Sequence, residues 1–350
     1  MDTTIKTMTE GITYADTTEI ISNEDNGGFT KDIQLLIYVL IGIFGFLGNA
    51  FVFVVIGSNV KMRKSSINKL ILYQSAIDGS AAAWILITCY IRYDVLLEGR
   101  KGDLFCKLWM SKLIMWGLFC NSTLNLVVIT LERYFGMIHP LRHKRLVTTR
   151  LTYTAMAIPT IVSFVFMIPH VLLTSGLQDG NCVLLGIYPN MVTFRFHILF
   201  SSSFQFYLPL LIMIIAYGHI FIVLYSKSRD QSMQEGGQDG GRAERLQSAS
   251  RNVLKTMVTV CVVFFLCWVG NTSTFVLFAY GVIPPFFSSP WYHISTYLCF
   301  INCTVNPLVY SLQYHDFQNS AKQLLCKKKK DPDRLSGSVT TITETTTTPT

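Results

Sequence analysis

The chain contains 350 residues, of which half are hydrophobic and only 14% are charged, and its formal net charge is +8 at pH 7. Its mean hydropathy is +0.39. These values argue against an ordinary soluble domain and indicate a membrane protein.

The apolar residues are gathered into long blocks. The first, IQLLIYVLIGIFGFLGNAFVFVVIG (33–57), carries no charged residue and exceeds the roughly 20 residues that a helix needs to cross about 30 Å of hydrocarbon. A buried globular core explains one or two such runs, whereas seven predict an all-α membrane protein, a seven-transmembrane helix bundle. The other six predicted spans are 67–91, 108–131, 153–173, 196–225, 253–280 and 292–313.

Basic residues indicate the orientation of the chain. They gather in four segments on one side of a seven-span chain, 61–69, 142–150, 227–251 and 327–330. Because positively charged loops face the cytoplasm, we expect a multi-pass plasma-membrane protein with an extracellular N-terminus and a cytoplasmic C-terminus. The expected regions are a flexible extracellular segment (1–32), the transmembrane domain (33–314), a short amphipathic helix on the membrane surface (315–326) and a disordered tail (327–350).

Three cysteines lie outside the predicted spans or at their ends. Cys106 stands at the outer start of span three and Cys182 in the outer loop between spans four and five. Both face an oxidising compartment, which predicts a disulfide between them. Cys326 ends the predicted amphipathic helix; lipid acylation and a free cytosolic thiol both fit this position.

Six short motifs follow one another along the spans. They are GNA with Asn49, SAIDG with Asp78, LERY with Glu132, Arg133 and Tyr134, FYLPLL with Pro209 followed by Tyr217, FFLCW with Phe264 and Trp268, and NPLVY with Asn306, Pro307 and Tyr310. In this order and spacing they make the chain resemble the rhodopsin-like (class A) G protein-coupled receptors over nearly the whole membrane region. Within that family it is broadly similar to the neuropeptide receptors.

The chain departs from the family pattern in three places. Gly270 stands where span six has a proline, span four lacks its central tryptophan, and Cys106 lies two residues farther from Arg133 than usual. A glycine permits a helix bend but does not force one as proline does.

Asp78 is an ionisable residue in the middle of a predicted span. A charge there costs on the order of 3 kcal/mol and needs polar partners, which Ser122, Asn302 and Asn306 can supply. The two asparagines are four residues apart and share a helix face. The resemblance implies that this cluster binds a sodium ion through Asp78; a water-filled polar cluster is the alternative.

Phe264 and Trp268 are also four residues apart on one helix face. An aromatic stripe at this spacing is ordinary core packing when taken alone. The resemblance implies an activation relay, in which Trp268 senses the ligand and acts through Phe264 on Thr123 and Pro209.

Two positions argue against particular ligand classes. An opsin needs a lysine in span seven to form a Schiff base with retinal, and the matching residue is Phe300. Amine receptors use an aspartate in span three, and the matching residue is Met115. We therefore expect neither retinal nor an amine, and no cofactor apart from the sodium ion.

The predicted ligand site in the outer half of the bundle is aromatic and basic. A cation such as Lys112 can bind a carboxylate, or it can extend to the lipid headgroups. The pattern favours a peptide ligand, with a lipid or small acidic ligand as the alternative. The predicted ligand-binding residues are Arg92, Lys112, Met115, Trp116, Phe119, Arg195, His197, Asn271, Phe275 and Thr296.

Other classes of protein fit less well. A transporter or channel would line a pathway with charged residues, but the acids within the spans reduce largely to Asp78, and no inverted repeat is visible. The chain has no HExxH, phosphate-loop or G-x-S-x-G motif, so we do not expect an enzyme. Nucleic acid is not expected as a partner.

The predicted partners on the cytoplasmic side are proteins and the bilayer. The loop HPLRHKRL (139–146) and the base of span six are expected to bind a heterotrimeric G protein in a groove that opens on activation. Phosphorylation of the Ser/Thr-rich tail by receptor kinases is expected to recruit arrestin.

Glu132 and Arg133 follow an apolar run, where they form either a simple polar cap or a switch. Many members of the family hold this arginine with an acid at the base of span six, but the matching residue is Ser250, so the lock would depend on Glu132. The predicted coupling switch comprises Glu132, Arg133, Tyr134, Tyr217, Asn306, Pro307 and Tyr310.

Overall fold

The computed structural model describes residues 28–90, 98–178, 180–184, 186–232, 240–284 and 289–326. Nearly all of this chain is helical. In order, the elements are α3 (Gly28–Ser58), α4 (Val60–Lys64), α5 (Ser66–Tyr90), α6 (Gly99–Phe105), the π-helical turn η3 (Cys106–Met110), α7 (Leu113–Ile138), α8 (Pro140–Leu146), α9 (Thr149–Thr174), β1 (Gly176–Gln178), β2 (Asn181–Val183), α10 (Met191–Ser202), the π-helical turn η4 (Ser203–Tyr207), α11 (Leu208–Ser232), α12 (Gly240–Ala279), α13 (Pro290–Gln313) and α14 (His315–Cys326).

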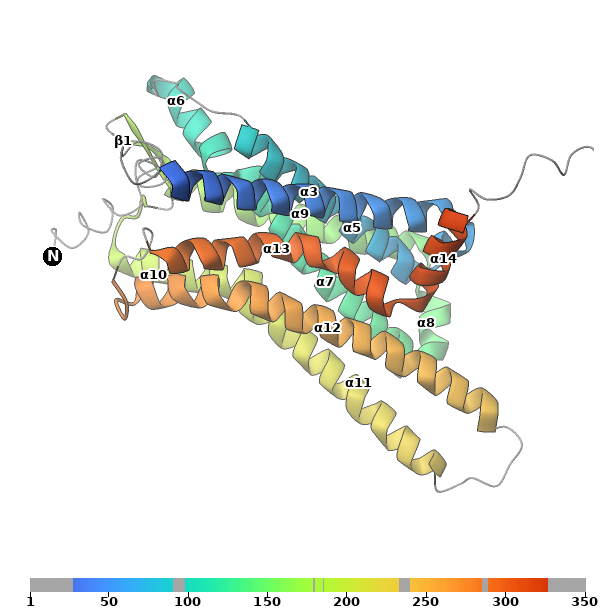
Figure 1. Cartoon of the computed structure of the whole chain (residues 1–350). Coiled ribbons are helices and arrows are strands. Elements are labelled where there is room, and N and C mark those ends of the chain that lie inside the picture. The colour runs from blue at the N-terminus through green and yellow to red at the C-terminus, as the bar shows by residue number, and fades with distance from the viewer. Residues whose placement is uncertain are drawn as a thin grey trace, which may run out of the picture.

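The long helices lie side by side as a bundle (Figure 1). By length and composition, six described segments can cross a membrane, namely Asp32–Ser58, Ser66–Tyr90, Gly99–Ile138, Thr149–Thr174, Met191–Ser226 and Val258–Ala279. The seventh long helix, α13, packs against α3, α5 and α12. The predicted seven-transmembrane bundle with a short additional helix, α14, is confirmed.

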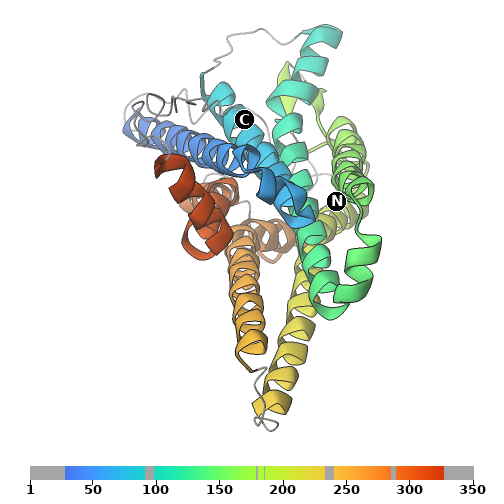
Figure 2. The same cartoon turned by 90° about the vertical axis from the view of Figure 1, so that its right-hand side faces the viewer.

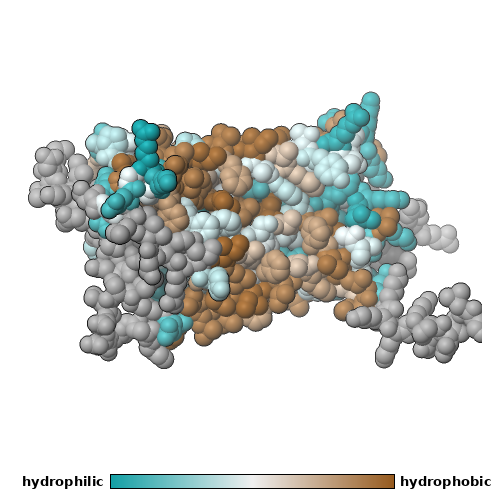
Figure 3. Space-filling model, turned by 90° about the horizontal axis from the view of Figure 1, so that it is seen from above, coloured by the Kyte–Doolittle hydropathy of each residue, from teal (hydrophilic) through white to brown (hydrophobic). Residues whose placement is uncertain are grey.

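The surface of the bundle is apolar across its middle. Figure 3 shows a hydrophobic region flanked by hydrophilic residues at both ends. Large side chains on several helices point outward, such as Phe44, which is 62% exposed, and Ile215, which is also 62% exposed. Because such a surface is unfavourable in water, it indicates burial in hydrocarbon.

The two ends of the bundle differ, and we name them by their contents. The disulfide end carries α6, the β1–β2 hairpin and the start of α10, whereas the α14 end carries α8 and α14 (Figure 1). The hairpin is antiparallel, with Leu177 opposite Cys182. The predicted disulfide joins Cys182 to Cys106, with their Cα atoms 5.5 Å apart, and so attaches the hairpin to η3.

Two helices extend farther than their apolar runs predict. Helix α7 continues to Ile138, which places LERY inside the helix rather than at its end. Helix α12 begins at Gly240, before the predicted start of span six at 253.

Helix α12 also runs without interruption through Gly270, where an added Cβ would lie 3.1 Å from the Trp291 ring. Here glycine permits close packing of α13. At the α14 end, α11 and α12 project away from the other helices in both views (Figures 1 and 2).

Candidate functional site

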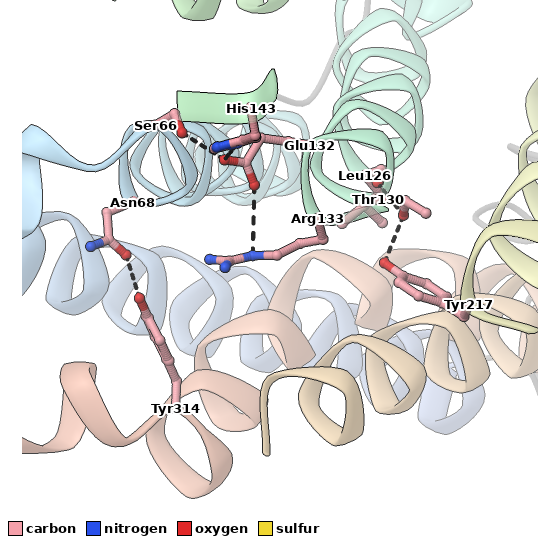
Figure 4. Close-up of polar contacts among 9 residues, drawn as sticks. All are labelled: Ser66, Asn68, Leu126, Thr130, Glu132, Arg133, His143, Tyr217 and Tyr314. Carbon is pink, nitrogen blue, oxygen red and sulfur yellow. Dashed lines mark hydrogen bonds and ion pairs between the residues drawn. The ribbon is translucent and has the colours of Figure 1, made fainter. Parts of the chain in front are cut away.

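Glu132 joins three elements at the α14 end (Figure 4). One of its carboxylate oxygens accepts a hydrogen bond from Ser66 Oγ on α5 at 2.6 Å and lies 3.1 Å from Nε2 of His143 on α8. Its other oxygen lies 3.7 Å from Arg133 Nε. The carboxylate therefore holds α5 and α8 against α7, which is more than a simple polar cap requires.

Tyrosines attach the neighbouring helices to α7 at this end. Tyr217 on α11 forms a hydrogen bond with Thr130 at 2.7 Å, one helical turn from Arg133 (Figure 4). The hydroxyl of Tyr134 lies 2.9 Å from His219 Nδ1, which gives a second link between α7 and α11. Tyr310 on α13 is buried in the same core cluster as Tyr217. Of the predicted switch residues, Glu132, Arg133, Tyr134 and Tyr217 thus lie together at this end, whereas Asn306 bonds to Asp78 in the middle of the bundle.

Tyr314, between α13 and α14, makes a further contact that the sequence did not predict. Its hydroxyl donates a hydrogen bond of 2.6 Å to Asn68 Oδ1 on α5 (Figure 4). Burial raises the pKa of Tyr314 above its usual range, so the hydroxyl keeps the proton that it donates. Helix α14 is anchored to α3 through Phe317, whose ring centre lies 5.9 Å from that of Phe51.

Asp78 is completely buried in the middle of the bundle. Its Oδ1 accepts a hydrogen bond from Ser122 Oγ at 2.7 Å. Its Oδ2 accepts from Asn306 Nδ2 at 2.8 Å and from Gln74 Nε2 at 3.0 Å. Among the described residues, no hydrogen bond joins the buried Asn302 to this carboxylate. The structure brings together three of the four predicted cluster residues and adds Gln74.

Aromatic rings pack against one another on the side of this cluster that faces the disulfide end. Phe119 on α7 lies 5.5 Å from Phe300 and 6.3 Å from Trp268, measured between ring centres. Trp116 lies 5.9 Å from Phe119 and 6.2 Å from Phe300. Met115, only 1% exposed, belongs to the same core cluster. The position at which an amine receptor carries its aspartate is therefore apolar and enclosed.

The predicted relay residues are buried on three helices. Phe264 lies one helical turn before Trp268 on α12, and their ring centres are 6.2 Å apart. The ring centre of Phe264 also lies 5.8 Å from that of Phe206, which belongs to η4, the turn before α11. Pro209 follows one turn later on α11, and Thr123 on α7 is 1% exposed. Phe206 is thus an aromatic contact that the motif did not predict.

Lys112 has an unusual backbone conformation at the start of α7. Its φ of 54° is the only positive value among the described residues other than glycine, and such a conformation costs on the order of 1–3 kcal/mol. The side chain is partly buried, and no hydrogen bond or ion pair joins its ammonium group to another described residue. Lys107, one turn earlier, instead pairs with Asp103 at 2.8 Å.

The other predicted ligand residues lie in two places at the disulfide end. Asn271 Nδ2 donates a hydrogen bond to Ser295 Oγ at 3.4 Å and joins α12 to α13, on which Thr296 is also buried. Arg195 is directed to the end of α12, where its Nε donates to the Ala279 carbonyl at 3.1 Å. Phe275 packs with the α10–α12 cluster. Arg92 lies outside the described residues.

His197 pairs with groups that the sequence did not predict. Its Nδ1 lies 2.6 Å from the Tyr188 hydroxyl, and its ring centre lies 4.4 Å from that of His170 on α9. Burial raises the pKa of Tyr188, which lies in the loop before α10, so this hydroxyl stays protonated. The ring cluster joins α9 to α10 at the disulfide end.

The chain is similar in sequence to several known receptors. Human trace amine-associated receptor 1 is 26% identical over 337 residues, which cover 87% of this chain and 92% of the relative. The human histamine H2 receptor is 26% identical over 307 residues, covering 85% and 79%. The human alpha-1A adrenergic receptor is 24% identical over 344 residues, covering 86% and 71%.

The family model described as "7 transmembrane receptor (rhodopsin family)" matches residues 48–310, which is most of the chain. That range contains the Glu132–Arg133 pair, the Asp78 cluster and the aromatic core. Proteins of this family are receptors, and not enzymes, that bind extracellular ligands and couple to G proteins. The chain therefore belongs to the rhodopsin family of seven-transmembrane receptors and is a multi-pass protein of the plasma membrane.

Proposed function

We propose that this receptor binds an extracellular ligand with a carboxylate group, most simply a peptide, at its disulfide end, and activates heterotrimeric G proteins at its α14 end. The disulfide end faces the outside in this proposal. Support for the orientation comes from α4 and α8 at the opposite end, which together carry Lys61, Arg63, Lys64, Arg142, Lys144 and Arg145. Clusters of basic residues favour the cytoplasmic side.

The observation that carries the ligand proposal is the environment of Lys112. Its ammonium group is partly removed from water and has no described acidic partner. A partly buried cation without a counter-ion is costly, and a ligand carboxylate would supply the missing partner. Lys112 precedes α7, and its carbonyl accepts a hydrogen bond from the backbone N–H of Trp116 at 3.0 Å.

A peptide fits the surrounding side chains better than an acyl chain does. Asn271 on α12 and Thr296 on α13 carry an amide and a hydroxyl group, which bond to Ser295 and to the Tyr292 carbonyl at 3.4 and 2.8 Å. Sites of this kind combine apolar walls with a few polar groups that orient the ligand. A peptide can exchange hydrogen bonds with these groups, whereas the acyl chain of a lipid cannot.

An amine is the second candidate, because the names of the relatives refer to trace amines, histamine and adrenergic signalling. The structure offers an ammonium group little at the disulfide end. Met115 is buried in the hydrophobic core, and both oxygens of Asp78 already accept hydrogen bonds. Among the described residues, Asp78 is the only aspartate or glutamate that is buried.

The proposal also covers the partners at the α14 end. We propose that helix α14, which ends at Cys326, lies at the membrane surface and that Cys326 is a site of lipid acylation. The Ser/Thr-rich segment 336–348 lies outside the described residues; its phosphorylation by receptor kinases would recruit arrestin.

The test is a ligand screen read out as nucleotide exchange on G proteins. The panel contains peptides with a free C-terminal carboxylate, the same peptides with an amidated C-terminus, fatty acids and biogenic amines. In Lys112→Met, acidic ligands should lose about 10- to 150-fold in potency, because a charged hydrogen bond contributes about 1.5–3 kcal/mol. Lys107→Met is the matched control, since Lys107 is already paired with Asp103. Activation by amines alone, with unchanged potency in Lys112→Met, would reject the proposal.

A further inference from the structure

Gln74 lies at the centre of the buried polar cluster around Asp78 and belongs to none of the family motifs. The side chain is completely buried. Its Nε2 donates hydrogen bonds to Asp78 Oδ2 at 3.0 Å and to Ser122 Oγ at 2.6 Å. Its Oε1 accepts a hydrogen bond from Asn125 Nδ2 at 2.8 Å. A single amide thus links α5 to two positions on α7 in the middle of the bundle.

Asn125 fixes which way the Gln74 amide points. The nitrogen of Asn125 also faces the backbone carbonyl of Leu70, at 3.3 Å. A carbonyl can only accept a hydrogen bond, so the NH₂ group of Asn125 must face α5. The oxygen of Gln74 must then face Asn125, and its NH₂ group must face Asp78. Reversing the Gln74 amide would place oxygen against the carboxylate and nitrogen against nitrogen.

This arrangement does not fit the sodium ion that the family resemblance predicts. Hard cations are bound by oxygen lone pairs, but both carboxylate oxygens of Asp78 already face donor groups. Those donors are the hydroxyl of Ser122 and the NH₂ groups of Asn306 and Gln74. The hydrogens of an NH₂ group carry partial positive charge, so the Gln74 amide both fills the space next to the carboxylate and repels a cation from it.

We infer that the Gln74 amide takes the place of the cation, so that the conformational equilibrium of this receptor does not depend on sodium. Asp78 is held instead by hydrogen bonds from its own helix, from α7 and from Asn306 in the NPLVY motif of α13. The inference concerns the middle of the bundle and is independent of the ligand class proposed for the disulfide end. Gln74 acts here as a positioning residue.

The first arm of the test uses the full-length wild-type receptor in lipid nanodiscs. Sodium chloride replaces choline chloride up to about 0.15 M at constant ionic strength, so that general screening does not change. The readouts are the midpoint of thermal unfolding and nucleotide exchange on G proteins without ligand. Both should stay constant. A saturable, sodium-specific shift in the wild type that Asp78→Asn removes would overturn the inference.

The second arm removes the amide. Gln74→Leu replaces the amide with an apolar side chain of similar size and removes one donor to the carboxylate. This variant should gain a sodium-specific rise in the unfolding midpoint of about 2–4 °C when the sodium concentration is several-fold above the Kd of the site. The response should disappear in the double variant Gln74→Leu/Asp78→Asn. A folded Gln74→Leu receptor without any sodium response would show that Gln74 is not what excludes the ion. If Gln74→Leu does not fold, the wild-type arm still decides the question.

Ser75→Ala provides the matched control for the second arm. Ser75 neighbours Gln74 on α5 and is equally buried, but its hydroxyl donates within its own helix, to the Ile71 carbonyl at 3.0 Å. This variant should behave as the wild type does in sodium and in choline. A sodium response in Ser75→Ala equal to that in Gln74→Leu would assign the effect to general loosening of α5 and would contradict the inference.

Discussion

Glu132→Gln removes one negative charge from the α14 end of α7 and leaves the shape of the side chain almost unchanged. The amide oxygen can still accept the hydrogen bond from Ser66. The 3.7 Å attraction to Arg133 Nε and the 3.1 Å contact with His143 Nε2 lose their charged partner. The substitution therefore weakens the links of Glu132 to Arg133 and α8 selectively.

The size of the effect follows from the exposure of the pair. The side chains of Arg133 and Glu132 are 19% and 11% exposed, so the pair is more protected than a surface ion pair, which contributes about 0.2–1 kcal/mol. With the His143 contact included, we expect a loss of about 1–1.5 kcal/mol. If these contacts exist only in the closed bundle, the ratio of active to inactive receptor rises about 5- to 12-fold.

The assay is ligand-free nucleotide exchange on G proteins at matched receptor density in nanodiscs. Glu132→Gln should raise this basal rate about 5- to 12-fold, and Arg133→Ala should abolish coupling while surface expression persists. Ser66→Ala and His143→Gln keep the Glu132 charge, so each should raise the basal rate by less. An unchanged basal rate in Glu132→Gln together with normal coupling in Arg133→Ala would refute the reasoning and leave the pair as a simple cap.

Two further predictions concern the stability of the bundle. Gly117→Ala places a Cβ 2.6 Å from the Phe164 ring, so overpacking between α7 and α9 should cost about 1–3 kcal/mol and lower the unfolding midpoint; Gly57→Ala, where no atom lies within 4 Å of the new Cβ, is the control that should not. Cys106→Ser opens the bond to Cys182, whose sequence separation is 76, and should cost about 2–5 kcal/mol, measured by thermal unfolding with dithiothreitol-treated wild type as the comparison.

The bundle could be predicted from the sequence because bilayer thickness sets the length of apolar runs. The same signal misplaces helix ends, since hydropathy follows the membrane and not the helix. Span three is an example: its apolar run ends at 131, but α7 continues to Ile138. The segment ERYFGMI (132–138) continues the helix, and all of its residues are half-buried. For this reason the Glu132–Arg133 pair has neighbours on both sides along α7.

The buried polar contacts were only partly predictable. Gln74 lies four residues before Asp78 and must share its helix face, so a polar residue in this apolar span was an available signal. The contact between His143 and Glu132 had no such signal. These residues are eleven positions apart, and they meet only because the chain turns at His139 between α7 and α8. Local spacing carries no information about a turn of this kind.

The ligand class illustrates how overall similarity and local chemistry can differ. Identities of 24–26% spread over most of the chain reflect a shared helix bundle, whose packing constrains many positions weakly. Recognition of an ammonium group depends on one carboxylate, and a single substitution removes it. Met115 is 1% exposed and lies in the hydrophobic core, where an acid would be an unpaired buried charge that costs several kcal/mol. In the ligand site that we propose, Lys112 lies one turn from Met115 and supplies a cation in place of an acid. An acidic ligand is therefore compatible with a helix bundle shared with receptors whose names refer to amines.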